Sequence, residues 1–197
     1  MVLAAVCLKV CFSAHGVKAT NVQIWEYYRG IFMLSWRAAV SNDFDLIQRI
    51  GEETHTSLPE RQEVFEDKFR LFPEGSFVLA KGFSVFGYGI SHPWKLFDIP
   101  PLDSFLGTLP NKPDCIFVHD VVVLPAGRGH RASDKFVALV ADLARERDIH
   151  RLSLVSVYDT HPLWSRLGFK AETGTFLQPK LATYGKTARY MTLRLAL

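Results

Sequence analysis

The sequence of 197 residues contains few cysteines, and none of them are paired in a recognisable motif. Only Cys7, Cys11 and Cys115 are present, with no C-x-x-C spacing. An odd number of unpaired cysteines argues against a disulfide framework, and Cys115 lies beside an apolar run, where a buried free thiol is common. The histidines show no metal-ligand spacing with one another or with the cysteines. We therefore expect a reducing, cytoplasmic location and no metal site.

Long apolar runs and clusters of one charge are also missing. The apolar stretch around 121–123 stops well short of the roughly 18 to 20 residues that a membrane helix needs. The 23 basic and 20 acidic residues are spread along the chain without a run of five like charges, and the net charge is +3. We therefore expect no membrane association and no nucleic acid binding. An apolar content of 48% and this length indicate one globular domain.

The beginning of the chain differs from the rest in composition. Residues 1–23 contain no acidic residue, and Lys9 and Lys18 flank a weakly apolar stretch. Lys9 interrupts this stretch, arginine is absent from it, and no clear cleavage site follows. We therefore interpret the segment as part of an N-terminal extension, with a targeting peptide as the alternative. We divide the chain into an N-terminal extension of unclear role, 1–33, and a domain, 34–197.

Hydrophobic periodicity predicts an alternation of strands and helices. Ser41 or Asn42 is expected to cap the first helix, and Ser57 with Glu60 forms a capping-box pattern for the second. The predicted strands are 34–40, 76–80, 85–91, 115–124, 151–157 and 189–195, and later helices are expected over 134–147 and 162–167. A Pro-rich insertion, 93–113, is too long for a hairpin turn.

The nearly continuous apolar run 115–124 is typical of a central strand covered on both faces. The helix 134–147 follows it and returns the chain to the strand 151–157, so these three elements predict a right-handed βαβ unit.

The connection 121–133 leads directly from this central strand into the helix. The unpaired N–H groups at the start of the helix, the helix dipole, Arg128, Arg131 and the flexible Gly127 and Gly129 together can cradle a phosphorylated ligand. An ordinary turn is the alternative, because the spacing matches neither the P-loop nor the Rossmann pattern.

A second segment, His161-Pro-Leu-Trp-Ser-Arg-Leu-Gly-Phe169, makes this loop more specific. Together the two segments resemble the cofactor motifs of the GCN5-related N-acetyltransferase superfamily. That family has a V-x-x-x-P strand entering an R/Q-x-x-G-x-G/A loop, and a later F-Y-x-x-x-G-F helix. Arg128 fits the first loop position, and Leu163 to Phe169 fit the second motif. The resemblance covers 34–197 in element order. It implies a single mixed α/β domain whose mostly antiparallel central sheet opens at the βαβ unit and is flanked by helices.

The resemblance also implies acetyl-CoA as co-substrate, seated in that opening. Direct attack of a free amine on the thioester is implied, without a covalent acyl-enzyme, and backbone N–H groups near Val121 and Val123 polarise the carbonyl. The residues then expected to contact the cofactor are Val121, Val122, Val123, Arg128, Gly129, His130, Arg131, Ala132, Ser133 and Trp164.

Two departures from the family pattern affect these expectations. Arg131 and Ser133 stand where the pattern has Gly and then Gly or Ala. Trp164 replaces the tyrosine that many members use to protonate the departing thiolate, and an indole N–H cannot act as that acid. Tyr158 and Tyr184 are possible substitute acids. The departures also motivate a different hypothesis, a CoA-binding module without turnover.

His119 and Asp120 lie on the predicted central strand, nine and eight residues before Arg128. Strand alternation sends their side chains to opposite faces, so at most one is expected to point at a given cleft. His119 matches the position at which the arylalkylamine and polyamine branch of the family carries a histidine that helps to deprotonate the amine. An imidazole suits that role, although a structural histidine is the alternative. We predict His119, Asp120 and Tyr158 as the catalytic residues.

These residues lead to a prediction about the acceptor. We expect the primary amine of a small molecule, an arylalkylamine or a polyamine, with a protein N-terminus as the alternative. The insertion 93–113 is long enough to roof the cleft, and Trp94, Phe97 and Phe105 are expected to form an apolar wall. We expect a monomer or a homodimer.

Overall fold

The structure, a computed structural model, describes residues 33–196. Apart from Met33, the predicted extension 1–33 lies outside the described residues. Within the described part of the chain, no helix combines the length and the apolar character that a membrane crossing requires.

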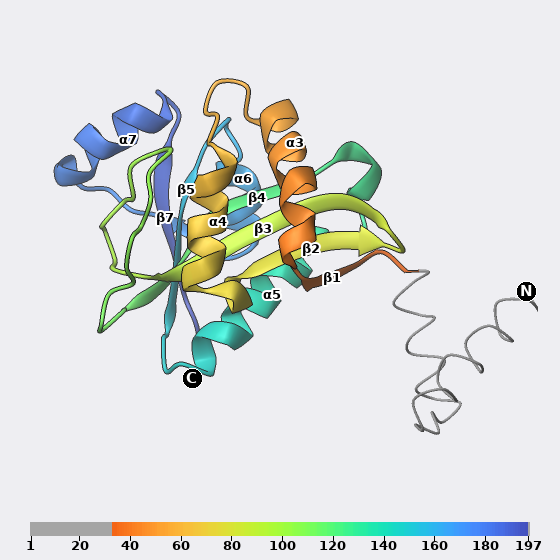
Figure 1. Cartoon of the computed structure of the whole chain (residues 1–197). Coiled ribbons are helices and arrows are strands. Elements are labelled where there is room, and N and C mark those ends of the chain that lie inside the picture. Colours follow the sequence, from red (N-terminus) through yellow and green to blue (C-terminus); the bar gives the residue numbers. More distant parts are fainter. Residues whose placement is uncertain (1–32, 197) are drawn as a thin grey trace, which may run out of the picture.

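A seven-stranded sheet forms the centre of the fold (Figure 1). Its order is β1-β2-β3-β4-β5-β7-β6, and all neighbouring pairs are antiparallel except β4 and β5. This arrangement confirms the predicted fold class and all six predicted strands, and it adds only the short β6. The strands are β1 (Ser35–Ala38), β2 (Ser76–Lys81), β3 (Ser84–Trp94), β4 (Cys115–Val123), β5 (Arg151–Ser156), β6 (Lys170–Ala171) and β7 (Arg189–Arg194).

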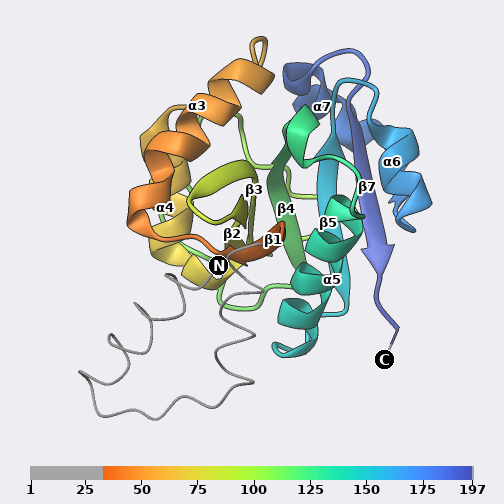
Figure 2. The same ribbon diagram turned by 90° about the vertical axis from the view of Figure 1, so that its right-hand side faces the viewer.

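Helices cover both faces of this sheet, with α3 and α4 on one face and α5 and α6 on the other (Figure 2). Buried clusters around Ile47 and Phe65 on the first face, and around Phe136 and Trp164 on the second, join them to the strands. Helix α7, which the periodicity does not predict, packs with the insertion after β3. The helices are α3 (Phe44–Thr54), α4 (Gln62–Leu71), α5 (Ala132–Arg145), α6 (His161–Arg166) and α7 (Gln178–Tyr184), with single 3-10 turns at Ser41–Asp43, Pro73–Gly75, Pro125–Gly127 and Thr175–Leu177.

Helix α4 begins later than the capping-box pattern predicts. The predicted cap is Ser57, but the helix starts at Gln62. Ser57 Oγ instead donates to the Tyr158 hydroxyl at 3.1 Å, and Glu60 Oε1 accepts from the Asp103 N–H at 2.9 Å. The prediction was wrong because these tertiary partners take the place of a local cap. They hold the connection between α3 and α4 against the rest of the domain.

The parallel pair β4 and β5 stays together over only a few residues. Ile116 to Val118 of β4 pair with Leu152 to Leu154 of β5, whereas β4 continues to Val123. Beyond this point the two strands separate, at the βαβ unit where the sequence predicts an opening. The separated part of β4 therefore has one edge without a strand partner.

Aromatic packing fixes the first turn of α5 against the sheet. Trp36 Nε1–H of β1 donates to the Ala132 carbonyl at 2.8 Å, and the Trp36 ring lies 5.1 Å from the Phe136 ring. Phe136 is fully buried and rests on Gly89 of β3. A Cβ at Gly89 would lie 2.2 Å from Cε2 of Phe136, so only glycine allows this close approach.

Gly89→Ala should therefore lower the free energy of unfolding by about 1 to 3 kcal/mol, because the added methyl group displaces a closely packed ring. Urea denaturation measures this change. In a Phe136→Leu background the same substitution should cost less, since the smaller side chain leaves room for the methyl group. An equal cost in both backgrounds would contradict the contact as the cause.

Candidate functional site

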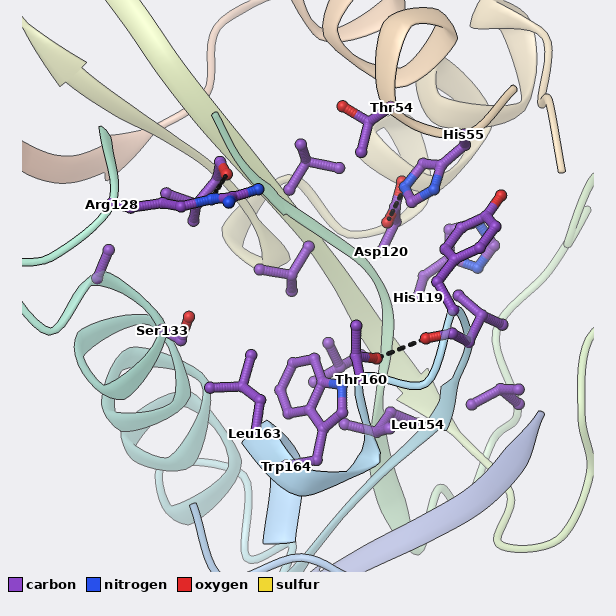
Figure 3. Close-up of a pocket in the computed structure, with 18 of the residues that line it drawn as sticks. Thr54, His55, His119, Asp120, Arg128, Ser133, Leu154, Thr160, Leu163 and Trp164 are labelled. Atoms are coloured by element: carbon purple, nitrogen blue, oxygen red, sulfur yellow. Dashed lines mark hydrogen bonds and ion pairs between the residues drawn. The ribbon is translucent and has the colours of Figure 1, made fainter. Parts of the chain in front are cut away.

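One large cavity lies where β4 and β5 separate (Figure 3). Its volume is about 850 Å³, and it extends from the first turn of α5 to the connection between α3 and α4. Every residue that the sequence predicts to bind the cofactor or to act in catalysis lines it: His119, Asp120, Val121, Val122, Val123, Arg128, Gly129, His130, Arg131, Ala132, Ser133, Tyr158 and Trp164. The structure thus brings all of these residues together in one site.

The loop before α5 forms one end of this cavity. Gly129, His130 and Arg131 all have positive φ, at 80°, 48° and 53°, so the chain turns sharply into the helix. The first N–H groups of α5 have no acceptor within the helix, and they lie at the positive end of its dipole. This end of the cavity can bind an anionic group.

The arginines at this end differ in their partners. Arg131 lies 3.2 Å and Arg166 3.3 Å from the carboxylate of Asp134, and 82% of the Arg131 side chain is exposed. Arg128 has no carboxylate partner among residues 33–196, and its Nε makes only a long contact, 3.4 Å, to the Val123 carbonyl. Arg128 is therefore the arginine whose charge is available to a ligand.

The middle of the cavity is an apolar slot beside the unpaired edge of β4. Leu154 of β5 and Leu163 and Trp164 of α6 line it (Figure 3). Trp164 is 8% exposed and packs against Phe169, with ring centroids 5.5 Å apart. Such a slot suits a narrow chain that carries both methylene and amide groups, because backbone and apolar side chains border it together.

A β-bulge places His119 and Asp120 on the same face of the sheet. Ile90 of β3 lies opposite Asp120, whereas Ser91 lies opposite Val118, so His119 is an extra residue in the ladder. Both side chains reach partners from the connection between α3 and α4. The prediction that they point to opposite faces was wrong, because alternation holds only in an uninterrupted ladder.

The first of these partners is Glu60, whose Oε2 lies 2.7 Å from His119 Nε2; the two side chains are only 7% and 3% exposed. Burial raises the pKa of Glu60, but the charge and hydrogen bond of His119 and the charge of Lys68 outweigh it and hold the pKa at about 2. Glu60 is therefore an anion at neutral pH and favours a proton on His119 Nε2. Nδ1 of His119 is buried without a hydrogen-bond partner among the described residues.

Asp120 pairs with a second imidazole, that of His55, which directly follows α3. His55 Nε2 lies 3.0 Å from Asp120 Oδ1, and the Tyr88 hydroxyl donates to Oδ2 at 2.5 Å. The Tyr158 ring stacks on His55, with centroids 5.6 Å apart and 12° between the planes. Burial lowers the pKa of His55, but the hydrogen bond and charge of Asp120 and the charge of Glu60 outweigh it and raise the pKa.

The two tyrosines predicted as substitute acids differ in their hydrogen bonds. The Tyr158 hydroxyl accepts from Ser57, as described above, so its own proton stays free. The Tyr184 hydroxyl donates to the Pro100 carbonyl at 2.6 Å, and burial, with the charge of Glu60, raises its pKa well above the ordinary value. The proton of Tyr184 is therefore unavailable near neutral pH.

The Pro-rich insertion contributes less than predicted. Leu102 lines the cavity, so the insertion does border the site. The predicted wall of Trp94, Phe97 and Phe105 was wrong, because none of the three lines this cavity. Each packs elsewhere, and Phe97, for example, lies beside Tyr190 on β7.

The sequence interpretation missed three members of the site: His55, Glu60 and Tyr88. Glu60 resembled a helix cap, and His55 was noted only as one of the histidines without metal-ligand spacing. The available signal was a pair of titratable residues in the short connection between two predicted helices, the kind of loop that often carries functional side chains. Among residues 33–196, no three His, Cys, Asp or Glu side chains are grouped so that they could hold a metal.

Comparison with known families gives the class of the protein. The model of the acetyltransferase (GNAT) family matches residues 37–169, which include both ends of the cavity. The chain belongs to this family of acetyltransferases. No curated protein sequence matches it.

Solved structures share the fold at low sequence identity. N-acetylglutamate synthase from Neisseria gonorrhoeae, complexed with coenzyme A and N-acetyl-glutamate, has a TM-score of 0.64 and 17% identity over 84% of this chain, which spans 36% of that protein. The NatC complex bound to Gag peptide and CoA has a TM-score of 0.63 and 15% identity, covering 84% of this chain and 100% of that one. Naa50 from Arabidopsis thaliana, in complex with a bisubstrate analogue, has a TM-score of 0.56 and 10% identity, covering 81% and 97%.

Glu60→Gln should remove part of the acid sensitivity of folding. Because the folded chain lowers the pKa of Glu60 from 4.5 to about 2, its ionised form stabilises the fold above the higher value, and this stabilisation is lost as the pH falls through the lower one. Over this range the free energy of unfolding should fall by about 3 kcal/mol more in the wild type than in the variant. Urea denaturation at a series of pH values measures both. Parallel curves would show that the pair with His119 does not stabilise the ionised form.

Proposed function

We propose that this protein transfers the acetyl group of acetyl-CoA to the primary amine of a small molecule, by direct attack of the amine on the thioester. The observation that carries the proposal is the arrangement of the cavity. One end has a helix N-terminus beside the unpaired Arg128, which suits a pyrophosphate, and the other has two imidazole–carboxylate pairs, which suit proton transfer.

The lining residues fit acetyl-CoA, which supplies an acetyl group already activated as a thioester. Arg128 and the loop 129–131 would hold the pyrophosphate together with the Ser133 N–H at the start of α5, since the Ala132 N–H already donates to the Gly129 carbonyl at 3.2 Å. The unpaired edge of β4, at 121–123, would bind the pantetheine amides and polarise the thioester carbonyl. Trp164 would form an apolar wall beside the thioester.

His119 would act as the base that removes a proton from the acceptor ammonium. Glu60 keeps the proton of His119 on Nε2, so Nδ1 holds the lone pair of the neutral imidazole. Because Nδ1 is shielded from water in this structure, the side chains around it would have to move before it could accept the proton. Asp120 would contribute indirectly, by its pairing with His55.

The acceptor end of the cavity favours an amine with an apolar body and no carboxylate. Leu58, Leu102, Tyr158 and Tyr184 line this end. The arginines that line the cavity, Arg128, Arg131 and Arg166, belong to the loop before α5 and to α6. An arylalkylamine or a polyamine fits this lining, and the contact of Tyr158 with Ser57 narrows the space for an extended peptide.

A protein N-terminus is the second candidate acceptor, because the NatC and Naa50 structures with this fold contain peptide ligands. A CoA-binding module without turnover is the third possibility, since Trp164 stands where the family has its tyrosine. We further propose a cytoplasmic location, because Cys115 is a fully buried free thiol and free thiols are usual in reducing compartments. We also propose a monomer or a homodimer.

Steady-state release of free CoA thiol from acetyl-CoA, with a panel of amines and of peptides with free N-termini, tests the proposal. We expect amine-dependent release, fastest with arylalkylamines or polyamines. Faster reaction with the peptides would replace the small-molecule acceptor by a protein N-terminus. Binding of CoA without release for any acceptor would favour the silent module.

Arg128→Glu should weaken acetyl-CoA binding about 5- to 150-fold, because a lost charge-assisted hydrogen bond costs about 1 to 3 kcal/mol and the new carboxylate repels phosphate. Isothermal titration calorimetry measures the Kd. Arg189→Glu, an exposed residue at the start of β7, is the matched control and should bind as the wild type does. Equal Kd values for both variants would place the pyrophosphate elsewhere.

A further inference from the structure

The departing thiolate of CoA needs a proton donor, and no group assigned so far supplies it. A thiolate is a poorer leaving group than a thiol, so a positioned acid accelerates its release. Trp164 offers only an indole N–H, which does not ionise in the neutral range. The O–H of Tyr184 is donated to the Pro100 carbonyl and is held there by burial.

Tyr158 is less firmly oriented as a proton donor than His55. Its hydroxyl accepts from Ser57 Oγ at 3.1 Å, which leaves its own proton free, but the residue is 42% exposed and no carboxylate among the described residues fixes the hydroxyl. Its ring, in contrast, covers His55. Tyr158, φ 52°, and the next residue, Asp159, φ 56°, both have left-handed backbone, which is unusual for residues with side chains. This backbone conformation places the Tyr158 ring against the His55 imidazole.

His55 has the surroundings of an oriented acid. One nitrogen is fixed 3.0 Å from Asp120, whose second oxygen accepts from Tyr88, so the carboxylate cannot turn away. The other nitrogen, Nδ1, has no hydrogen-bond partner among the described residues, and the side chain is 16% exposed and lines the cavity. Figure 3 shows His55 and Asp120 beside His119, at the end of the slot away from Arg128.

We propose that His55 is the acid that protonates the departing CoA thiolate, and that Asp120 and Tyr158 are positioning residues that orient its ring. This assignment rests on the proposed function. The site then contains two imidazole–carboxylate pairs with opposite tasks: His119 with Glu60 removes a proton from the amine, and His55 with Asp120 delivers one to sulfur.

The charged groups around His55 support its assignment as the acid. Asp120 on β4 and Glu60 in the connection after α3 are both anionic neighbours, Tyr88 on β3 holds Asp120, and Tyr158 from the loop after β5 stacks on the ring. Together the two carboxylates raise the pKa of His55 in spite of its burial. A larger fraction of His55 than of an isolated imidazole is therefore protonated at neutral pH.

The proton count of the reaction is balanced in this scheme. The acceptor ammonium loses two protons, the C–N bond forms, and the C–S bond breaks. The first proton leaves through His119 and water to the solvent. His55 gives its proton to the thiolate sulfur, and the second proton lost by nitrogen restores the proton on His55. One amide, one CoA thiol and one released proton result.

Comparison of two acetyl donors tests the assignment. With acetyl-CoA, His55→Gln should lower kcat about a hundredfold, the size of a general acid contribution. With 4-nitrophenyl acetate, whose leaving group departs without protonation, the same variant should lose less than about threefold. His119→Gln should be slow with both donors, because the amine must be deprotonated in either case. His150→Gln, which removes a surface histidine paired with Asp148, is the matched control.

The pH profile of kcat with acetyl-CoA provides a second readout, which is sufficient if the ester is not a substrate. An acid must be protonated, so wild-type kcat should fall as the pH rises through the ionisation of His55. This alkaline limb should be absent in His55→Gln. In Asp120→Asn it should shift to lower pH, because the variant removes the charge that favours protonated His55.

The outcomes separate this assignment from the proposed function. A wild type without amine-dependent thiol release would overturn both. An active wild type whose His55→Gln variant is equally slow with both donors, or that keeps its alkaline limb, would leave the transferase standing and reject His55 as the acid. Calorimetric titration with CoA checks that each variant still binds the cofactor.

Discussion

The separation of β4 from β5 is the constraint on which the rest of the site depends. The two strands share pairing only as far as Val118 and Leu154, and the βαβ connection then carries the chain away through α5. The same separation leaves one edge of β4 without a partner and directs the N-terminus of α5 toward the opening. A cavity of about 850 Å³ is thus part of the fold rather than an addition to it. The opening can therefore bind an anionic group at the N-terminus of α5 and, at the same time, an extended ligand chain along the unpaired edge of β4.

The bulge at His119 places the titratable side chains of His119 and Asp120 on the same side of this opening. One extra residue in the ladder turns two neighbouring side chains toward the same connection between α3 and α4. Burying the carboxylates of Glu60 and Asp120 would be costly if they were alone, but each has an imidazole and a further donor as partners. Lys68, itself almost fully buried, adds a positive charge near Glu60 and donates to the Ser104 carbonyl of the insertion. The charged groups therefore also hold the connection between α3 and α4 and the insertion together around this end of the cavity.

Core packing far from the two imidazole–carboxylate pairs sets the position of the other end of the cavity, at the first turn of α5. Trp36 on the edge strand β1 and Gly89 on β3 determine how closely Phe136, and with it the first turn of α5, approaches the sheet. The backbone donors expected to meet the cofactor are thereby fixed by the core, while Arg128 adds its charge from a loop. Donors built on helices and strands are positioned more precisely than groups on loops.

The sequence alone determined the elements and the loop that joins them, because periodicity and the Gly-Arg segment after a continuous apolar strand are local signals. It therefore predicted the fold class, the opening and the lining residues at 121–123 and 128–133. It could not predict the bulge, since pairing register is decided by the neighbouring strand. Nor could it assign Glu60, whose local pattern is that of a helix cap, or His55. Their roles come from partners about sixty residues away, His119 and Asp120, and only tertiary structure brings such residues within hydrogen-bond distance.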